Sequence, residues 1–221
     1  MKAKTILGIL VSGSGSNLQS IIDNIEQGKL DATIGVIISN RADAYALERA
    51  RRHHIPAVVV EHAAFSSRDD FDLKMIEILR SYSVELVVMA GFMRILTETF
   101  LNAFPMQILN IHPALLPSFQ GLHGQERAFD YGVKFSGCTV HFADTGVDTG
   151  PIIMQAVVPV FDDDTAESLQ QRILKEEHRI YPQAIRLYTE GRLEIRGRRV
   201  LIRDHGRLAD EALHNPPLDT F

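Results

Sequence analysis

Short runs of β-branched and aliphatic residues alternate with longer amphipathic segments through the first half of the chain. These runs predict five strands, at residues 5–12, 32–39, 56–60, 85–91 and 107–112. The amphipathic segments predict helices at residues 17–27, 42–53, 68–81 and 98–104. Nearly continuous apolar strands separated by helices are typical of parallel sheets that are covered on both faces. The alternation therefore predicts an α/β fold, with a Rossmann-like, mostly parallel sheet flanked by helices.

The pattern changes in the second half of the chain. Residues 137–144 and 151–160 are predicted to form two adjacent antiparallel strands, followed by a long helix over residues 165–191 that contains Pro182. Thr165 and Ser168 would make only a poor capping box for this helix. We also predict a small hairpin at residues 194–204, from its central glycine, and a loosely held end at residues 214–221.

Composition limits the classes of protein to consider. With 221 residues, 45% of them hydrophobic, the chain can bury a sizeable core in one domain. A net charge of -5 gives no reason to expect binding to nucleic acid or to an anionic membrane, and no apolar run is long enough to cross a bilayer. One cysteine, Cys138, excludes an intrachain disulfide framework, so we expect a cytoplasmic protein.

A glycine loop follows the first predicted strand, in the segment LVSGSGSNLQS. Gly13 and Gly15 precede a predicted helix, so backbone N–H groups and the positive helix end are placed to hold a phosphate. Leu18 replaces the third glycine of a dinucleotide fingerprint, which argues against a complete NAD site. The alternative is a tight turn in which Ser16 or Asn17 acts only as the helix N-cap.

Asn110 and His112 end the fifth predicted strand. Residues i and i+2 of a strand point to the same face, and the carboxyl end of a parallel strand borders the ligand-binding crevice of open α/β sheets. Asp144 and Asp148 flank a turn between the two later strands, where a carboxylate could orient an imidazole. The alternatives are a structural role for His112 and Asx turns for at least one aspartate.

Other polar clusters favour structural roles. His141 alternates with apolar residues, so we expect it to support the site or to pack rather than to react. The separation of His112, His141 and Asp148 matches no compact metal-binding motif, and we expect no metal. A basic tail lacks the interleaved aromatic residues that nucleic-acid binding favours; it comprises Arg192, Arg196, Arg198, Arg199 and Arg203.

Six segments together resemble the phosphoribosylglycinamide formyltransferase family, the folate-dependent enzymes of purine synthesis. They are SGSGSNLQ, ISNRADAYALERA, AGFMRIL, LNIHPALLPSFQGLHG, VHFADTGVDTGPII and EEHRIYPQAI, and the resemblance runs from about Ile6 to Gly191. Related tRNA formyltransferases and formylfolate hydrolases would need a further domain, for which 221 residues leave no room. The resemblance implies a single domain: a phosphate-binding half (1–112), a folate and catalytic half (113–191), and a hairpin with tail (192–221).

The resemblance also implies a role for each matching residue. It makes Asn110, His112 and Asp148 catalytic, and assigns the phosphoribosyl substrate to Gly15, Ser16, Asn17 and Glu177. It assigns the folate to Arg68, Met93, Arg94, Ile95, Leu96, Asn110, Ala143 and Asp144. Leu174, Ser118 and Gln120 depart from residues found in other members, which bears on substrate affinity. These departures leave Asn110, His112 and Asp148 unchanged.

The implied reaction transfers a formyl group from 10-formyltetrahydrofolate to the amine of N1-(5-phospho-D-ribosyl)glycinamide. Asn110 and a protonated His112 would donate hydrogen bonds to the oxyanion, while Asp148 would favour the charged imidazole by raising the pKa of His112. The alternatives are formyl transfer to another small amine, such as an amino-sugar nucleotide, or a non-catalytic phosphate-ligand-binding protein. Either substrate class is a small molecule, and we expect a monomer or homodimer.

Overall fold

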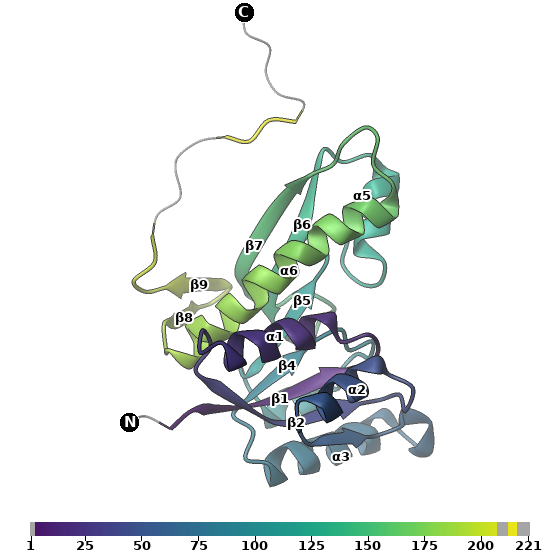
Figure 1. The fold of residues 1–221 in the computed structure, drawn as a ribbon, viewed down its shortest axis with the longest axis vertical. Coiled ribbons are helices and arrows are strands. Elements are labelled where there is room, and N and C mark those ends of the chain that lie inside the picture. The colour runs from purple at the N-terminus through teal and green to yellow at the C-terminus, as the bar shows by residue number, and fades with distance from the viewer. Residues whose placement is uncertain (1–2, 207–211, 216–221) are drawn as a thin grey trace, which may run out of the picture.

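The computed structural model describes residues 3–206 and 212–215, which form one α/β assembly around a nine-stranded sheet (Figure 1). The strand order is β3-β2-β1-β4-β5-β6-β7-β9-β8. The strands are β1 (Thr5–Val11), β2 (Ala32–Ser39), β3 (Ala57–Val59), β4 (Leu86–Met89), β5 (Ile108–His112), β6 (Phe135–Phe142), β7 (Ile152–Pro159), β8 (Leu193–Arg196) and β9 (Arg199–Ile202).

The sheet is parallel from β3 to β5 and then changes direction. β6 pairs antiparallel with both β5 and β7, and the β8–β9 hairpin joins the sheet through a short parallel pairing of β9 with β7. The predicted Rossmann-like, mostly parallel sheet with antiparallel strands toward the C-terminus is therefore confirmed.

Helices cover both faces of the sheet, each over its own apolar core. They are α1 (Ser16–Glu26), α2 (Tyr45–Arg52), the 3-10 helix η1 (His62–Ala64), α3 (Arg68–Ser81), α4 (Glu98–Ala103), α5 (Gly124–Tyr131) and α6 (Ala166–Thr189). One core joins the buried side chains of α1, α2 and α6 to the sheet, and the other joins those of α3 and α4 to the opposite face. The two cores exist because side chains alternate between the two faces of each strand.

Most predicted boundaries agree with the structure to within two residues, and the exceptions have local causes. The helix predicted from residue 42 begins only at Tyr45, because Arg41 and Asp43 pair side chains across a turn. Helix α5 was not predicted; its N-cap, His123, is left-handed at φ 59° and makes no side-chain cap bond, so the sequence gives no start signal.

The N-terminus of α6 corrects the expectation of a poor capping box. The Thr165 hydroxyl accepts from the Ser168 amide, and the Ser168 hydroxyl accepts from the Thr165 amide. Asp164 accepts from the Ser168 hydroxyl and forms a salt bridge with Arg172. These contacts fix Ser168 at the third helical position, where a capping box usually has glutamate or glutamine. The capping box is therefore complete.

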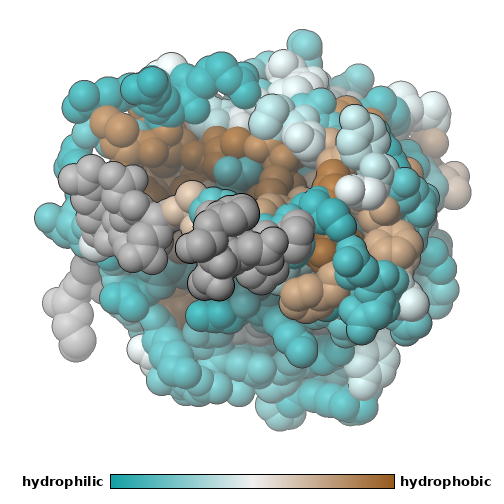
Figure 2. All heavy atoms as spheres, turned by 90° about the horizontal axis from the view of Figure 1, so that it is seen from above, coloured by the Kyte–Doolittle hydropathy of each residue, from teal (hydrophilic) through white to brown (hydrophobic). Residues whose placement is uncertain are grey.

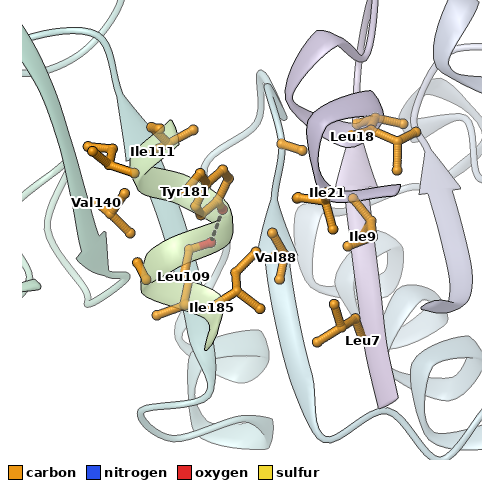
Figure 3. Packing of buried hydrophobic residues seen from close by; sticks show 14 of the residues in the cluster. Leu7, Ile9, Leu18, Ile21, Val88, Leu109, Ile111, Val140, Tyr181 and Ile185 are labelled. Carbon is orange, nitrogen blue, oxygen red and sulfur yellow. Dashed lines mark hydrogen bonds between the residues drawn. The ribbon is translucent and has the colours of Figure 1, made fainter. Parts of the chain in front are cut away.

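Tyr181 joins α6 to the centre of the sheet (Figure 3). Its buried hydroxyl donates toward two main-chain carbonyl oxygens on neighbouring strands, Met89 of β4 at 3.1 Å and Leu109 of β5 at 2.9 Å. Met89 ends β4, and Leu109 directly precedes Asn110 in β5. The tyrosine therefore ties the long helix to the two neighbouring strands β4 and β5 beside the candidate site.

Tyr181→Phe is expected to lower the free energy of unfolding by about 1–3 kcal/mol, because it leaves buried carbonyl groups without their donor. Denaturant titration measures the change. Tyr131→Phe is the matched control, since Tyr131 is 79% exposed. Equal stability of the two variants would contradict the bridging role of the Tyr181 hydroxyl.

The C-terminal segment lies partly outside the described residues. The predicted hairpin is present as β8 and β9. Of the end predicted as loosely held, residues 216–221 lie outside the described residues, and Asn215 donates to the carbonyl oxygens of Lys134 and Val160.

Within the described part of the chain, no helix has the length and apolar character to cross a membrane. Seen from above, apolar surface gathers in a recessed area bordered by hydrophilic side chains (Figure 2).

Candidate active site

The candidate site lies at the carboxyl edge of the parallel strands. The strand order reverses at β1, which has β2 on one side and β4 on the other, and ligands of open α/β sheets bind where this reversal occurs. The glycine loop follows β1, the segment from Gly91 follows β4, and Asn110 and His112 end β5. Asp148 belongs to the loop between β6 and β7.

The structure brings Asn110, His112 and Asp148 into direct contact. One carboxylate oxygen of Asp148 lies 3.2 Å from Nδ1 of His112, and the other accepts from Nδ2 of Asn110 at 3.2 Å. The side chains of His112 and Asp148 are 5% and 12% exposed. The charged and polar groups therefore face one another in a nearly water-free setting, where electrostatic interactions are strong.

His141 joins this cluster from β6, where it lies opposite Asn110 in the antiparallel register. Its Nε2 is 3.1 Å from Nδ2 of Asn110 and 3.5 Å from Asp148, while its Nδ1 faces the carbonyl oxygen of Phe142 at 2.8 Å. The predicted supporting position of His141 agrees with this geometry. No three His, Cys, Asp or Glu side chains of the described residues form a metal-binding group.

From the sequence we expected a raised pKa for His112, and the direction of that shift is wrong. Burial lowers the pKa of His112, and the nearby His141 and Arg127 lower it further. The Asp148 charge and the Phe119 carbonyl act in the opposite direction but do not outweigh burial. The sequence indicated the carboxylate partner but not the depth at which the ring is buried, so the desolvation of the charged form was missed.

Asp148 remains a carboxylate despite its burial. Burial opposes ionisation, but hydrogen bonding to His141 and to the Gly121 amide, together with the charges of His112 and His141, lowers the pKa of Asp148. The Gly121 amide donates at 2.8 Å. Asp148 thus supplies the negative charge of the cluster and contacts Asn110, His112 and His141.

Residues 119–121 contact His112 and Asp148, and sequence reasoning missed these contacts. The Phe119 carbonyl oxygen lies 2.9 Å from Nε2 of His112, so both nitrogens of this imidazole face oxygen atoms. Gln120 donates through Nε2 to the main-chain oxygen of Asp148 at 3.2 Å. Each of these contacts involves a main-chain atom, which leaves little trace in the sequence. The one sequence signal was Gln120, which departs from the residue found in other family members.

The glycine loop differs from a plain helix cap. Gly15 is the N-cap of α1 at φ 69°, and a Cβ atom there would meet Ala46 at 2.7 Å. Neither Ser16 nor Asn17 caps the helix, so the alternative of an ordinary side-chain cap is wrong. The Asn17 side chain instead donates to Glu177 of α6 at 2.7 Å, and burial raises the pKa of Glu177 to about 7 although this bond opposes the shift.

The segment after β4 is fixed by polar contacts on both sides. The Met93 amide donates to the Ser12 hydroxyl, and Arg68 donates to the Ile95 carbonyl, both at 2.8 Å. Met93 and Ile95 expose apolar side chains, whereas Leu96 packs in the core beneath α3 and α4. Met93 and Ile95 therefore form an apolar wall beside the site, and Leu96 supports this wall from the core.

Residues Ala143 and Asp144 lead from β6 into the loop that carries Asp148. The Ala143 amide donates to the Ile108 carbonyl, which keeps the start of the loop beside β5. Asp144 accepts from the Gly146 amide and the Thr149 hydroxyl, which is the predicted Asx-type turn. Asp144 and Asp148 therefore differ in their contacts: Asp144 shapes the loop, and Asp148 faces the histidines.

Comparison with known proteins gives one consistent result. Residues 6–185 match the formyl transferase family model. The chain is 44% identical to a phosphoribosylglycinamide formyltransferase of Haemophilus influenzae, over 86% of this chain and 90% of that protein. It is also similar to a crystal structure of glycinamide ribonucleotide transformylase 1 from Symbiobacterium toebii, with 54% identity, a TM-score of 0.91, and coverage of 92% of this chain and 96% of that one.

A third relative is much longer than this chain. The trifunctional purine biosynthetic protein adenosine-3 of Chironomus tentans is 44% identical over 85% of this chain, which spans only 14% of that protein. The fold, the crevice and these matches define one class: the chain belongs to the formyl transferase family. It is a one-carbon group transferase, and its family uses a formyl folate as donor.

Proposed function

We propose that this chain transfers a formyl group from 10-formyltetrahydrofolate to the amine of N1-(5-phospho-D-ribosyl)glycinamide. The products are formylglycinamide ribonucleotide and tetrahydrofolate, in the synthesis of purines. The observation that carries the proposal is the contact of Asp148 with both Asn110 and His112 at the carboxyl edge of the sheet. The name of the Haemophilus influenzae relative supports the choice of acceptor.

The chemistry requires donors and a route for one proton. The acceptor amine attacks the formyl carbon, and the carbonyl becomes an oxyanion in a tetrahedral intermediate. Asn110 Nδ2 and the imidazolium of His112 donate to this oxyanion. The C–N bond to the folate nitrogen then breaks, that nitrogen gains a proton, and the acceptor nitrogen loses one. Asp148 stabilises the charged ring while the proton moves.

The hydrogen bonds of His112 define what the substrate must displace. Nδ1 faces the Asp148 carboxylate and Nε2 faces the Phe119 carbonyl, so the ring has no free nitrogen in this arrangement. We infer that the formyl oxygen replaces the Phe119 carbonyl as the partner of Nε2. The Asp148 contact is kept during this exchange, because that carboxylate orients the ring.

The glycine loop and α6 supply the acceptor site. Amides after Gly15 and the positive end of α1 favour the phosphate, since α1 begins without an acidic residue in its first turn. Ser16 and Asn17 lie at this end, and Asn17 donates to Glu177, to which we assign the contact with the ribose. The folate is assigned to the wall after β4, with Arg68, Arg94 and the backbone near Ala143 and Asp144 beside it.

The test is incubation of the protein with both substrates while the deformylated folate is followed optically. We expect turnover with the phosphoribosyl acceptor. Turnover only with an amino-sugar nucleotide would support the alternative acceptor class, and binding of the phosphate ligand without turnover would support the non-catalytic alternative. We also propose a cytoplasmic location, because the one cysteine of the sequence, Cys138, is buried. A monomer or homodimer remains our proposal for the oligomeric state.

The phosphate assignment predicts discrimination between two acceptors. The dephosphorylated ribonucleoside is expected to be a much poorer substrate, and Ser16→Glu is expected to raise KM for the phosphorylated acceptor because it places a negative charge at the helix end. Steady-state kinetics measures both effects. Ser81→Glu, at the far end of α3, is the control. Equal kcat/KM for the two acceptors would remove the phosphate from this loop.

A further inference from the structure

Two side chains outside the catalytic cluster bind consecutive carbonyl groups of the loop that carries Asp148. Gln120 Nε2 donates to the main-chain oxygen of Asp148 at 3.2 Å, and Arg198 Nη2 donates to that of Thr149 at 2.7 Å. Asp148 has φ 54°, in the left-handed region that L residues rarely adopt. The backbone at this point therefore adopts an uncommon conformation and depends on surrounding contacts.

Gln120 belongs to a segment that contacts both members of the histidine and aspartate pair. The residue before it, Phe119, faces His112 with its carbonyl, and the residue after it, Gly121, donates its amide to Asp148. Arg127 of α5 holds this segment from the outer side by donating to the Gln120 carbonyl at 2.7 Å. A change at Gln120 therefore acts on the catalytic pair through short, direct contacts.

Arg198 reaches the same loop from the C-terminal hairpin. It lies in the turn between β8 and β9, which joins the main sheet where Ile152 pairs with Arg199. Within the hairpin, Arg203 donates its amide to the Arg192 carbonyl, which closes the two strands. The hairpin lies beyond residues 6–185, the part of the chain that matches the family model.

We propose that Gln120 and Arg198 are positioning residues that hold the Asp148–Thr149 backbone, and with it the catalytic carboxylate, in register with His112. The inference rests on the proposed formyl transfer. Neither side chain touches the reacting atoms. Both act through Asp148, whose displacement by about 1 Å can cost about 10²-fold in rate.

The pH profile distinguishes positioning from general support of the fold. The titratable and charged groups facing the pair are His141 from β6 and Arg127 from α5, in addition to Asp148 and His112 themselves. The Gly121 amide lowers the pKa of Asp148, and the Asp148 charge raises the pKa of His112. Loosening the loop weakens both contacts, so the pKa of Asp148 rises and the pKa of His112 falls. The acid limb of the pH profile of kcat, which reports Asp148, then moves to higher pH, and the alkaline limb, which reports His112, moves to lower pH.

The experiment compares Gln120→Leu, Arg198→Met and the double variant with the unaltered protein. Each single variant is expected to lower kcat about fivefold, or about 1 kcal/mol at 1.4 kcal/mol per tenfold change, with KM for both substrates changed less than twofold. The double variant is expected to lose about 25-fold or more. The pH profile of kcat should be narrower for each variant than for the unaltered protein.

Two control variants match the substitutions. Gln171→Leu changes an exposed glutamine of α6, and Arg199→Met removes a neighbouring arginine whose side chain forms no hydrogen bond with the described loop residues 144–150. Unchanged kcat in Gln120→Leu and Arg198→Met, or a fall that leaves both limbs in place, would overturn the inference. An unaltered protein without formyl transfer would instead overturn the proposed function.

Discussion

Replacing either donor of the proposed oxyanion site by alanine is expected to lower kcat by about 10²–10³-fold. The variants are His112→Ala and Asn110→Ala, and the reason is that each removes a group aimed at charge that develops only during the reaction. KM is expected to change much less, because the ground-state formyl carbonyl carries little of that charge. Steady-state kinetics with both substrates measures the split.

The controls for these variants remove the same kind of side chain at exposed positions. They are His205→Ala in the C-terminal segment and Asn102→Ala on α4. Circular dichroism and thermal unfolding report whether His112→Ala and Asn110→Ala remain folded. A folded variant with kcat within tenfold of the unaltered value would show that the oxyanion is stabilised elsewhere.

Asp148→Asn is expected to lower kcat by about 10²-fold or more with a modest change in substrate binding. The substitution keeps the shape of the side chain but removes the charge that supports the imidazolium. Burial already lowers the pKa of His112, and Asp148 opposes that shift. Removing the carboxylate therefore moves the His112 titration to still lower pH, so less of the ring is protonated at neutral pH.

NMR of ring-labelled protein measures this titration, with His112→Asn identifying the signal among nine histidines. Asp144→Asn is the matched control, because Asp144 binds its own loop through Gly146 and Thr149. A His112 titration that stays in place or moves upward in Asp148→Asn would refute electrostatic support by this aspartate. A larger shift in Asp144→Asn would assign that role to Asp144.

Periodicity predicted the elements whose form is decided by local residues. Helix α3 begins and ends where expected because Ser67 accepts from the Asp70 amide and an apolar face follows at helical spacing. The pairing of Asn110 with His112 on one strand face was also predictable, since the period of a strand is fixed. Contact of this pair with Asp148 was inferred from loop composition and family resemblance, and the structure places the three together.

Features set by long-range burial or main-chain contacts were not predictable in this way. The depth of His112 depends on residues from several elements, so its pKa could not be read from the aspartate alone. Phe119 and Gly121 act through backbone atoms, which leave no side-chain signature. Helix α5 follows an N-cap, His123, in the left-handed conformation, and a sequence pattern carries no information on that conformation.

The bond between Asn17 and Glu177 also bears on how the protein is made. It joins residues 160 positions apart, across α1 and α6. During synthesis, β1 to β5 leave the ribosome before α6 exists, so α1 lacks the helix with which it packs most extensively until α6 has been made. Closing so long a loop is slow and leaves apolar surface open meanwhile. The proposed acceptor site thus depends on one of the latest steps of folding, and a chain cut short before residue 177 has strands and a glycine loop but lacks Glu177, the acid proposed to contact the ribose.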